Sequence, residues 1–167
     1  MAAEITIPEG GASGILATIG GRFGGWGLLL QDSKPEFAYA FSNQPEHKFR
    51  VASQQPLPAG NHLVRIAFRY DGGGYGKGAT AVLFVDEKQV AEARLPRSIG
   101  IRFSLDETFD IGEDTGTPVI EDYVDKMPFR FTGTLRKVVV VLEPEKLTEQ
   151  ELERLREEAA AACLAVQ

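Results

Sequence analysis

The sequence predicts an all-β fold in which two antiparallel sheets form a sandwich, with one α-helix at the C-terminal end. Short segments rich in β-branched and aromatic residues recur along the chain, and turn residues, including many of the 18 Gly and 9 Pro, separate them. A helical pattern is found only after residue 146. The 167 residues are enough for one well-buried core but not for two ordinary domains. We therefore predict a sandwich domain over residues 1–146 and a helical appendage over residues 147–167.

The strands are predicted where apolar, β-branched and aromatic residues cluster between turn signals. In chain order they are Ile5–Ile7, Gly14–Ile19, Gly25–Leu30, Glu36–Phe41, Lys48–Ala52, Leu63–Tyr70, Thr80–Val85, Val90–Leu95, Phe109–Ile111, Phe129–Phe131 and Leu135–Leu142.

Two kinds of strand are distinguished by their patterns. Leu63–Tyr70 alternates, so that Val64, Ile66 and their period-two successors share one buried face. By contrast, Ala81–Val85 and Val138–Leu142 are apolar at every position, which predicts central strands covered on both sides. We therefore expect an additional layer over the outer face of one sheet.

The helix is predicted from its start signals. Thr148 and Glu151 form a capping box, and Leu147 and Leu152 form a hydrophobic staple around it. An apolar stripe then recurs at three- and four-residue steps, at Leu152, Leu155, Ala159, Ala162 and Val166. Such a stripe must be buried, against the sandwich, against a partner domain or against a second copy in a homo-oligomer.

Charge and composition exclude several classes of protein. A net charge of −6 without a run of Lys and Arg argues against nucleic-acid binding and against binding to an anionic membrane surface. There is no apolar stretch of the roughly 18 residues that a membrane span requires. Met1–Gly11 lacks the features of a signal peptide, and the lone Cys163 excludes an internal disulfide framework, so the cytoplasm is the default location.

Two glycine-rich segments are candidates for binding loops. Arg22 and Trp26, surrounded by glycines, provide either a ligand-binding loop or a bulged hairpin with Trp26 in the core. Asp71–Gly78 reads DGGGYGKG, but its spacing fits neither of the phosphate-loop patterns, and no helix follows it. We interpret this second segment as a surface loop.

No catalytic group and no resident metal is predicted. His47 and His62 are the only histidines, which excludes a three-histidine zinc site, and no nucleophile-elbow motif is present. The acidic stretch 106–125 offers oxygen ligands suited to Ca²⁺, although it lacks the spacing of an EF-hand loop. A calcium site and a solvated acidic rim both remain open at this point.

Several motifs, in this order and spacing, resemble the C-terminal accessory domain of bacterial arylsulfatases. They are GGRFGGW at 20–26, LPAGNH at 57–62, YDGGGYGKG at 70–78, LFVD at 83–86, FSLDETFDIGEDTGTPVIEDY at 103–123 and FTGTL at 131–135. The resemblance implies a concanavalin A-like jelly roll whose partner is a separate sulfatase catalytic domain. The formylglycine signature of that catalytic domain is missing, because Phe37 stands where the motif at Ser33–Phe37 requires arginine.

The chain departs from the family pattern at a few positions. Leu29 and Ala40 replace Tyr and Asn, which makes a sheet face more apolar. Glu87 replaces a hairpin glycine, and we expect it to occupy a strained turn with positive φ.

Three functional hypotheses follow. The first is a non-catalytic accessory or binding module. The second is a stand-alone isomerase or cyclase that binds a small molecule on a concave sheet, and the third is a calcium-dependent, sugar-binding, lectin-like module with an exposed aromatic platform. The residues selected as ligand contacts are Trp26, Tyr39, Arg50, Asp110 and Asp114.

Overall fold

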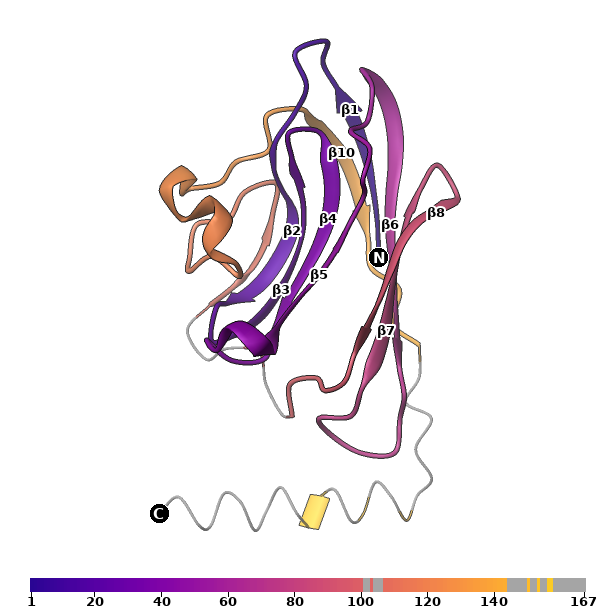
Figure 1. Ribbon diagram of the computed structural model, residues 1–167, viewed down its shortest axis with the longest axis vertical. Coiled ribbons are helices and arrows are strands. Elements are labelled where there is room, and N and C mark those ends of the chain that lie inside the picture. The colour runs from indigo at the N-terminus through magenta and orange to yellow at the C-terminus, as the bar shows by residue number, and fades with distance from the viewer. Residues whose placement is uncertain (101–102, 104–106, 144–149, 151–152, 154–155, 158–167) are drawn as a thin grey trace.

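Two five-stranded antiparallel sheets lie face to face in the structure, a computed structural model (Figure 1). It describes residues 1–100, 103, 107–143, 150, 153 and 156–157. The strands are β1 (Ala2–Ile7), β2 (Gly14–Gly21), β3 (Gly24–Gln31), β4 (Lys34–Ala40), β5 (Lys48–Ala52), β6 (Gly60–Tyr70), β7 (Ala79–Val85), β8 (Lys88–Leu95), β9 (Phe109–Ile111) and β10 (Thr134–Val139). Two short 3₁₀ helices, η1 (Pro45–His47) and η2 (Glu121–Lys126), lie between strands.

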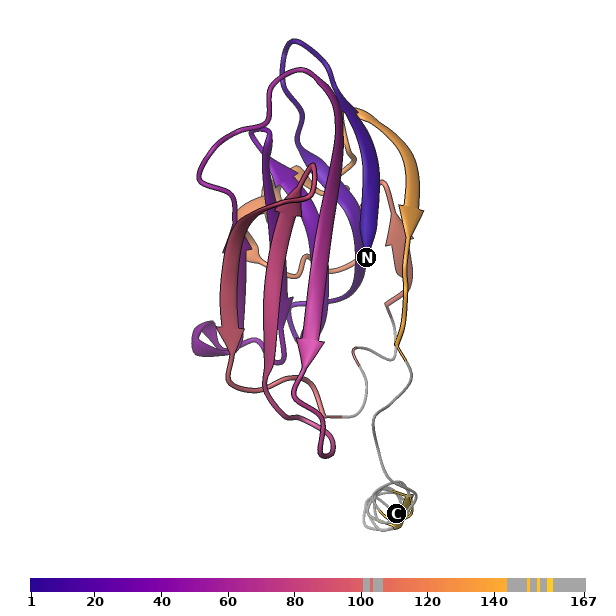
Figure 2. The same ribbon diagram turned by 90° about the vertical axis from the view of Figure 1, so that its right-hand side faces the viewer.

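The strand order is β10-β1-β6-β7-β8 in the first sheet and β5-β4-β3-β2-β9 in the second. The chain enters the first sheet with β1, passes to the second for β2 to β5, returns for β6 to β8, and crosses twice more to place β9 and β10. Figure 2 shows the first sheet from its outer side. The predicted fold class, an antiparallel two-sheet jelly-roll sandwich, is confirmed.

The main core lies between the sheets because strand alternation turns one apolar row of each strand inward. Its most deeply buried members include Ile5, Ile7, Leu16, Leu28, Leu30, Val64 and Leu83. The predicted alternation in β6 is confirmed by Val64 and Ile66, which are almost fully buried.

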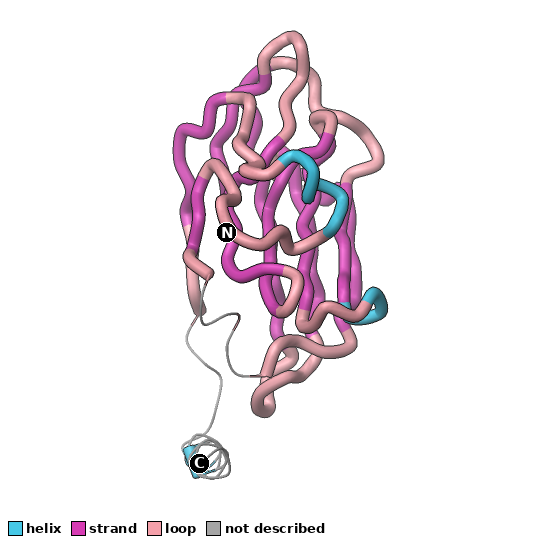
Figure 3. The backbone as a smooth tube through the Cα atoms, turned by 90° about the vertical axis from the view of Figure 1, so that its left-hand side faces the viewer, coloured by secondary structure: helices cyan, strands magenta, loops and turns pink. Residues whose placement is uncertain are grey.

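A second core lies on the outer face of the second sheet. Residues 113–131, here called the cover segment, include η2 and pass over this face (Figure 3). Val119, Ile120 and Tyr123 of the cover segment pack there with Leu29 and Ala40 of the sheet. An extra layer was expected, but it covers the second sheet, whereas the continuously apolar segments that predicted it include β7 and part of β10 of the first sheet. The two apolar replacements noted in the sequence lie beneath the layer.

Two strand predictions are wrong. Phe129–Phe131 forms no strand; it belongs to the cover segment, where the Phe129 N–H donates to the Asp114 carbonyl at 3.0 Å. Val138–Leu142 is not part of a central strand, because β10 ends at Val139 and forms an edge of the first sheet. In contrast, β7 is central, between β6 and β8, as predicted for Ala81–Val85.

The turn between β7 and β8 has the expected strained geometry. Asp86 and Glu87 adopt φ values of 47° and 64°, in the left-handed region that favours glycine. The predicted helix over residues 147–167 falls largely outside the described residues and stays a prediction. Among the residues that the structure does describe, no helix has the length and apolar character needed to cross a membrane.

Candidate binding site

The five predicted contact residues do not form one site. Trp26 and Tyr39 are cross-strand partners in β3 and β4, and both face the interior between the sheets. Arg50 and Asp110 point to the opposite, outer face, and Asp114 belongs to the cover segment on that same side. The structure therefore divides the set between two faces of the second sheet.

Trp26 and Tyr39 pack against other aromatic rings between the two sheets. Tyr39 is 2% exposed, its ring stacks on Phe68 with centroids 5.6 Å apart, and its hydroxyl accepts the Ile99 N–H at 2.8 Å. Burial raises the pKa of Tyr39. The Trp26 ring lies 6.2 Å from Phe37, centroid to centroid. Aromatic rings thus occupy the inner face where a concave ligand site was hypothesised, and Trp26 takes the core position of the hairpin interpretation.

Asp110 and Asp114 are held by local hydrogen bonds. Asp110 accepts from the hydroxyls of Thr108 and Thr115 at 2.6 and 2.8 Å, and the Thr108 bond chiefly lowers the pKa of Asp110. Asp114 accepts from Tyr123 at 2.8 Å, and burial raises the pKa of Asp114. Within residues 107–143 and the rest of the described chain, no three His, Cys, Asp or Glu side chains are grouped to hold a metal. Because Asp106 lies outside the described residues, calcium binding by the whole acidic stretch stays a prediction.

Arg50 anchors a polar network between β5 and η2. Its Nη2 donates to Oε2 of Glu36 at 2.9 Å, its Nε donates to the other Glu36 oxygen, and its Nη1 donates to Asp122 at 2.7 Å. The Glu36 hydrogen bonds chiefly raise the pKa of Arg50. Beside it, Lys48 pairs with Glu121 and lowers the pKa of that carboxyl. Glu36 is buried, while Glu121 and Asp122 are open to solvent.

These groups border a surface hollow of about 270 Å³. It is lined by Asn43, Pro45, Lys48, Arg50, Ile120, Glu121 and Asp122. The hollow contains both hydrogen-bond donors and acceptors, and its basic side chains are matched by acidic ones. A second hollow, of about 360 Å³, lies at the far end of the sandwich and includes His62 and Asp86.

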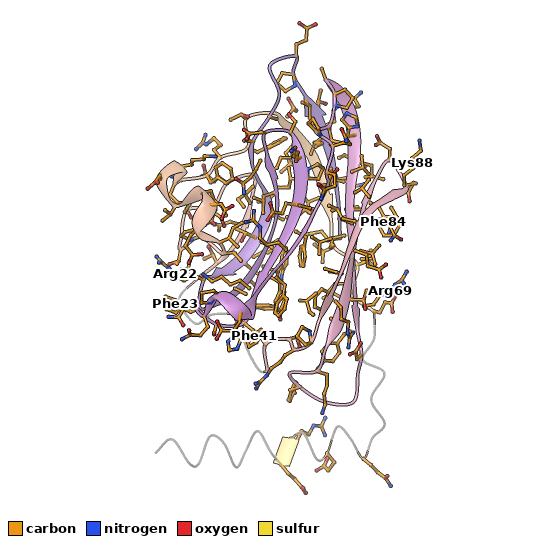
Figure 4. All side chains as sticks on the ribbon, viewed as in Figure 1. Arg22, Phe23, Phe41, Arg69, Phe84 and Lys88 are labelled. Carbon is orange, nitrogen blue, oxygen red and sulfur yellow. The ribbon has the colours of Figure 1, made fainter. Side chains whose placement is uncertain are left out.

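Arg22 and Phe23 form the tip of the β2–β3 hairpin, at the same end of the second sheet as Phe41 (Figure 4). The hollow beside Lys48 lies at this end too, because Gly25, Ala40 and Lys48 share one row of the sheet. The Phe23 ring is 67% exposed, and the Arg22 guanidinium carbon lies 5.9 Å from its centroid. The charge of Arg22 also helps to lower the pKa of Glu121, although Lys48 has the larger effect. The buried Nε of Arg22 has no hydrogen-bond partner among the described residues.

Sequence reasoning selected Trp26 in this segment and passed over Phe23. The sequence contained a signal for Phe23, because a pair of glycines flanks Arg22 and Phe23 on each side. In the structure Gly21 pairs with Gly24 across the hairpin. That symmetry predicts a two-residue turn, which would display both side chains.

Ser42 and His47 form a hydrogen bond of the kind found in hydrolytic triads. Ser42 Oγ lies 2.7 Å from His47 Nδ1, but this oxygen also accepts the Gln44 N–H at 3.2 Å. Both bonds close the turn that contains η1. No carboxylate of the described residues hydrogen-bonds the other ring nitrogen of His47, so the contact lacks the third member of a hydrolytic triad.

No protein-family model matches the sequence, and no curated protein matches it. Among solved structures, the chain is similar to the crystal structure of the LG1-3 region of the laminin alpha2 chain, with 15% identity and a TM-score of 0.48. The match covers 79% of this chain and 24% of the laminin chain, so this protein spans about a quarter of that structure's length.

Proposed function

We propose that this protein is a non-catalytic binding module. It holds a saccharide-type ligand at the end of the second sheet that carries the β2–β3 hairpin tip and η1. The observation that carries the proposal is the 67% exposed Phe23 ring at a hairpin tip, at the same end of the second sheet as the polar hollow lined by Lys48, Arg50 and Asn43. An exposed aromatic platform was the feature expected of a sugar-binding module.

The chemistry of the hollow favours a neutral ligand rich in hydroxyl groups. Lys48 and Arg50 are already paired with carboxylates, so an anion would gain little from them. A hydroxyl can both donate and accept, which suits a hollow that contains ammonium, guanidinium, amide and carboxylate groups together. The apolar face of a sugar ring can pack on Phe23, whose burial would then be favourable.

The small-molecule isomerase hypothesis has less support, because Trp26 and Tyr39 pack against other rings on the inner face.

The finer assignment, an accessory domain that accompanies a sulfatase catalytic domain, rests on the motifs quoted in the sequence analysis. Within that assignment the domain would pack against the catalytic domain and shape the entry of substrate. It predicts no turnover by this chain alone, and metal-dependent release of sulfate from an aryl sulfate by the purified protein would contradict it.

Calorimetric titration with a panel of neutral oligosaccharides tests the proposal. We expect millimolar or tighter binding by at least one member, and a loss of at least about tenfold in affinity for Phe23→Ala. Tyr75→Ala, which removes a 55% exposed aromatic ring from the β6–β7 loop, is the matched control and should retain affinity. The absence of binding across the panel, or equal loss in both variants, would refute the proposal.

A further inference from the structure

The edge of the first sheet carries an apolar stretch that the fold leaves uncovered within the described residues. From Val139 to Leu142 the exposed fractions are 36%, 46%, 72% and 86%. Exposed apolar side chains are ordinary when scattered, but consecutive ones on a sheet edge mark an interaction surface.

The backbone of this stretch is also available for pairing. The ladder between β1 and β10 ends at the pair Ala2–Val139, and Val140 to Glu143 have no ladder partner among residues 1–143. On its other side, β10 pairs with no described strand. The unpaired N–H and C=O groups of an edge strand form a template for another strand.

The apolar surface continues onto the neighbouring edge of the second sheet. Figure 2 shows β9 and β10 on the same side of the sandwich. A Cβ atom added at Gly112, just after β9, would lie 3.6 Å from Leu135 of β10. Phe109 and Ile111 of β9 are 44% and 54% exposed. A chain that pairs with the β10 edge would therefore also have the exposed apolar side chains of β9 beside it.

The charges at the ends of the stretch identify the occupant. Lys137 precedes the five apolar residues 138–142, and Glu143 follows them; both charged residues are exposed. Two copies of one strand can pair antiparallel about a twofold axis perpendicular to the sheet. The numbers of any two facing residues then add up to the same value, and this value is even because facing side chains lie on the same side of the sheet. An axis through Val140 places Lys137 opposite Glu143 of the second copy, and it does so twice.

We propose that a second copy of this chain pairs antiparallel with the β10 edge, with Val140 on the twofold axis and two Lys137–Glu143 ion pairs at the ends. Val139 then faces Val141 of the other copy, and the two first sheets become one continuous sheet. A shift of two residues, the smallest that keeps side chains on their faces, would move the axis to Val139 and leave Lys137 opposite Val141 and Glu143 opposite Leu135. Within each copy, Lys137 also lies across from Glu4 of β1.

Sedimentation velocity of the full-length chain, from about 1 µM to about 500 µM, tests this pairing. We expect a concentration-dependent dimer that Val141→Lys weakens at least about tenfold, since this 72% exposed side chain lies at the centre of the interface. Lys88→Glu, on the opposite edge strand β8, is the control and should leave the dimer unchanged. Thermal melts that agree with wild type establish that each variant folds.

A mixing experiment tests the register. Lys137→Glu and Glu143→Lys each place like charges at both ends of their own homodimer, so each variant alone should dimerise weakly. Mixed together, the two variants restore opposite charges at both ends and should form a heterodimer.

Three outcomes would overturn the proposal. The first is a monomer at every concentration, and the second is a dimer that Val141→Lys leaves intact, which would indicate another surface such as residues 144–167. The third is a mixture that dimerises no better than its components. Because Phe23 lies between β2 and β3 of the second sheet and Val141 follows β10 of the first, Val141→Lys should retain oligosaccharide binding, so failure of the two proposals can be told apart.

Discussion

The Tyr123 hydroxyl donates a hydrogen bond of 2.8 Å to Oδ2 of Asp114, and the two residues are 0% and 2% exposed. The same hydroxyl accepts the Val119 N–H at 2.9 Å. One side chain thus ties together three points of the cover segment. The stack of its ring on Phe129, with centroids 4.8 Å apart, adds a fourth. This cluster holds the outer layer against the second sheet.

Tyr123→Phe keeps the ring and removes both hydrogen bonds. The Asp114 carboxyl and the Val119 N–H each lose a buried partner, so we expect the free energy of unfolding to fall by about 2–3 kcal/mol. Urea unfolding measures the change. Tyr75→Phe, at a 55% exposed ring, is the control and should change stability by less than about 0.5 kcal/mol. An equally small effect at Tyr123 would show that the hydroxyl does not hold the layer.

The buried carboxyl of Asp114 should make the stability of the fold depend on pH. Burial raises the pKa of this carboxyl in the folded state above its ordinary value, so the fold favours the protonated form. The contribution of this carboxyl to the free energy of unfolding is fully present below its pKa in the unfolded chain. It is lost as the pH rises through its pKa in the folded protein. Asp114→Asn does not titrate. We therefore expect wild type to lose stability relative to this variant as the pH rises from about 3 to about 7.

Urea midpoints of wild type and Asp114→Asn, compared across that pH range, check the sign. An increase in the advantage of wild type with pH would mean that the ionised carboxylate is the form that the fold stabilises. The raised pKa would then be wrong.

The strands were largely predictable because their signal is local. Period-two alternation in β6 and turn residues such as Asp86 are read directly from neighbouring residues. Phe129–Phe131 was wrongly assigned to a strand because an extended segment that covers a sheet has the same apolar and aromatic composition as a strand. Only the partners of its backbone groups distinguish the two, and those partners lie far away in sequence.

The candidate site was less predictable because strand order is not a local property. Arg50 and Asp110 occupy the same outer row, which runs through Ala38, Gly27 and Thr18. Their shared face follows from alternation, but four strand spacings separate them, or about 19 Å. The sequence contains both side chains, yet only the order β5-β4-β3-β2-β9 reveals that they lie at opposite edges.

The Arg50–Glu36 pair allows a double-mutant cycle. Arg50→Met leaves the buried Glu36 carboxylate without its main partner, and we expect the free energy of unfolding to fall by about 1–3 kcal/mol. This is less than the loss expected for a fully buried ion pair, because the Arg50 side chain is 41% exposed. In the double variant with Glu36→Gln the uncompensated charge is removed. Its destabilisation, measured by urea unfolding, should be smaller than the sum of the single effects by at least about 1 kcal/mol. Additive effects would mean that the two groups do not interact.

The turn between β7 and β8 should be improved by glycine. Glu87 adopts a φ of 64°, where a side chain costs about 1 kcal/mol, and its ion pair with Arg65 at 3.4 Å is exposed and contributes little. We expect Glu87→Gly to raise the free energy of unfolding by about 0.5–1 kcal/mol. Lys88→Gly, one residue later in the strand, should instead lower it by about the same amount. Thermal melts of both variants, shifted in opposite directions, would support this account of the turn.

The contact between the cover segment and β2 depends on the absence of a side chain at Gly21. A Cβ atom there would lie 2.6 Å from the Thr117 carbonyl oxygen, a backbone atom that can move only with the cover segment. We expect Gly21→Ala to destabilise the fold by about 1–3 kcal/mol, as overpacking does elsewhere. Gly10→Ala is the control: no atom lies within 4 Å of its added Cβ, and stability should be unchanged or slightly higher. If chemical denaturation finds the two variants equally stable, the cover segment is not packed against β2 at this point.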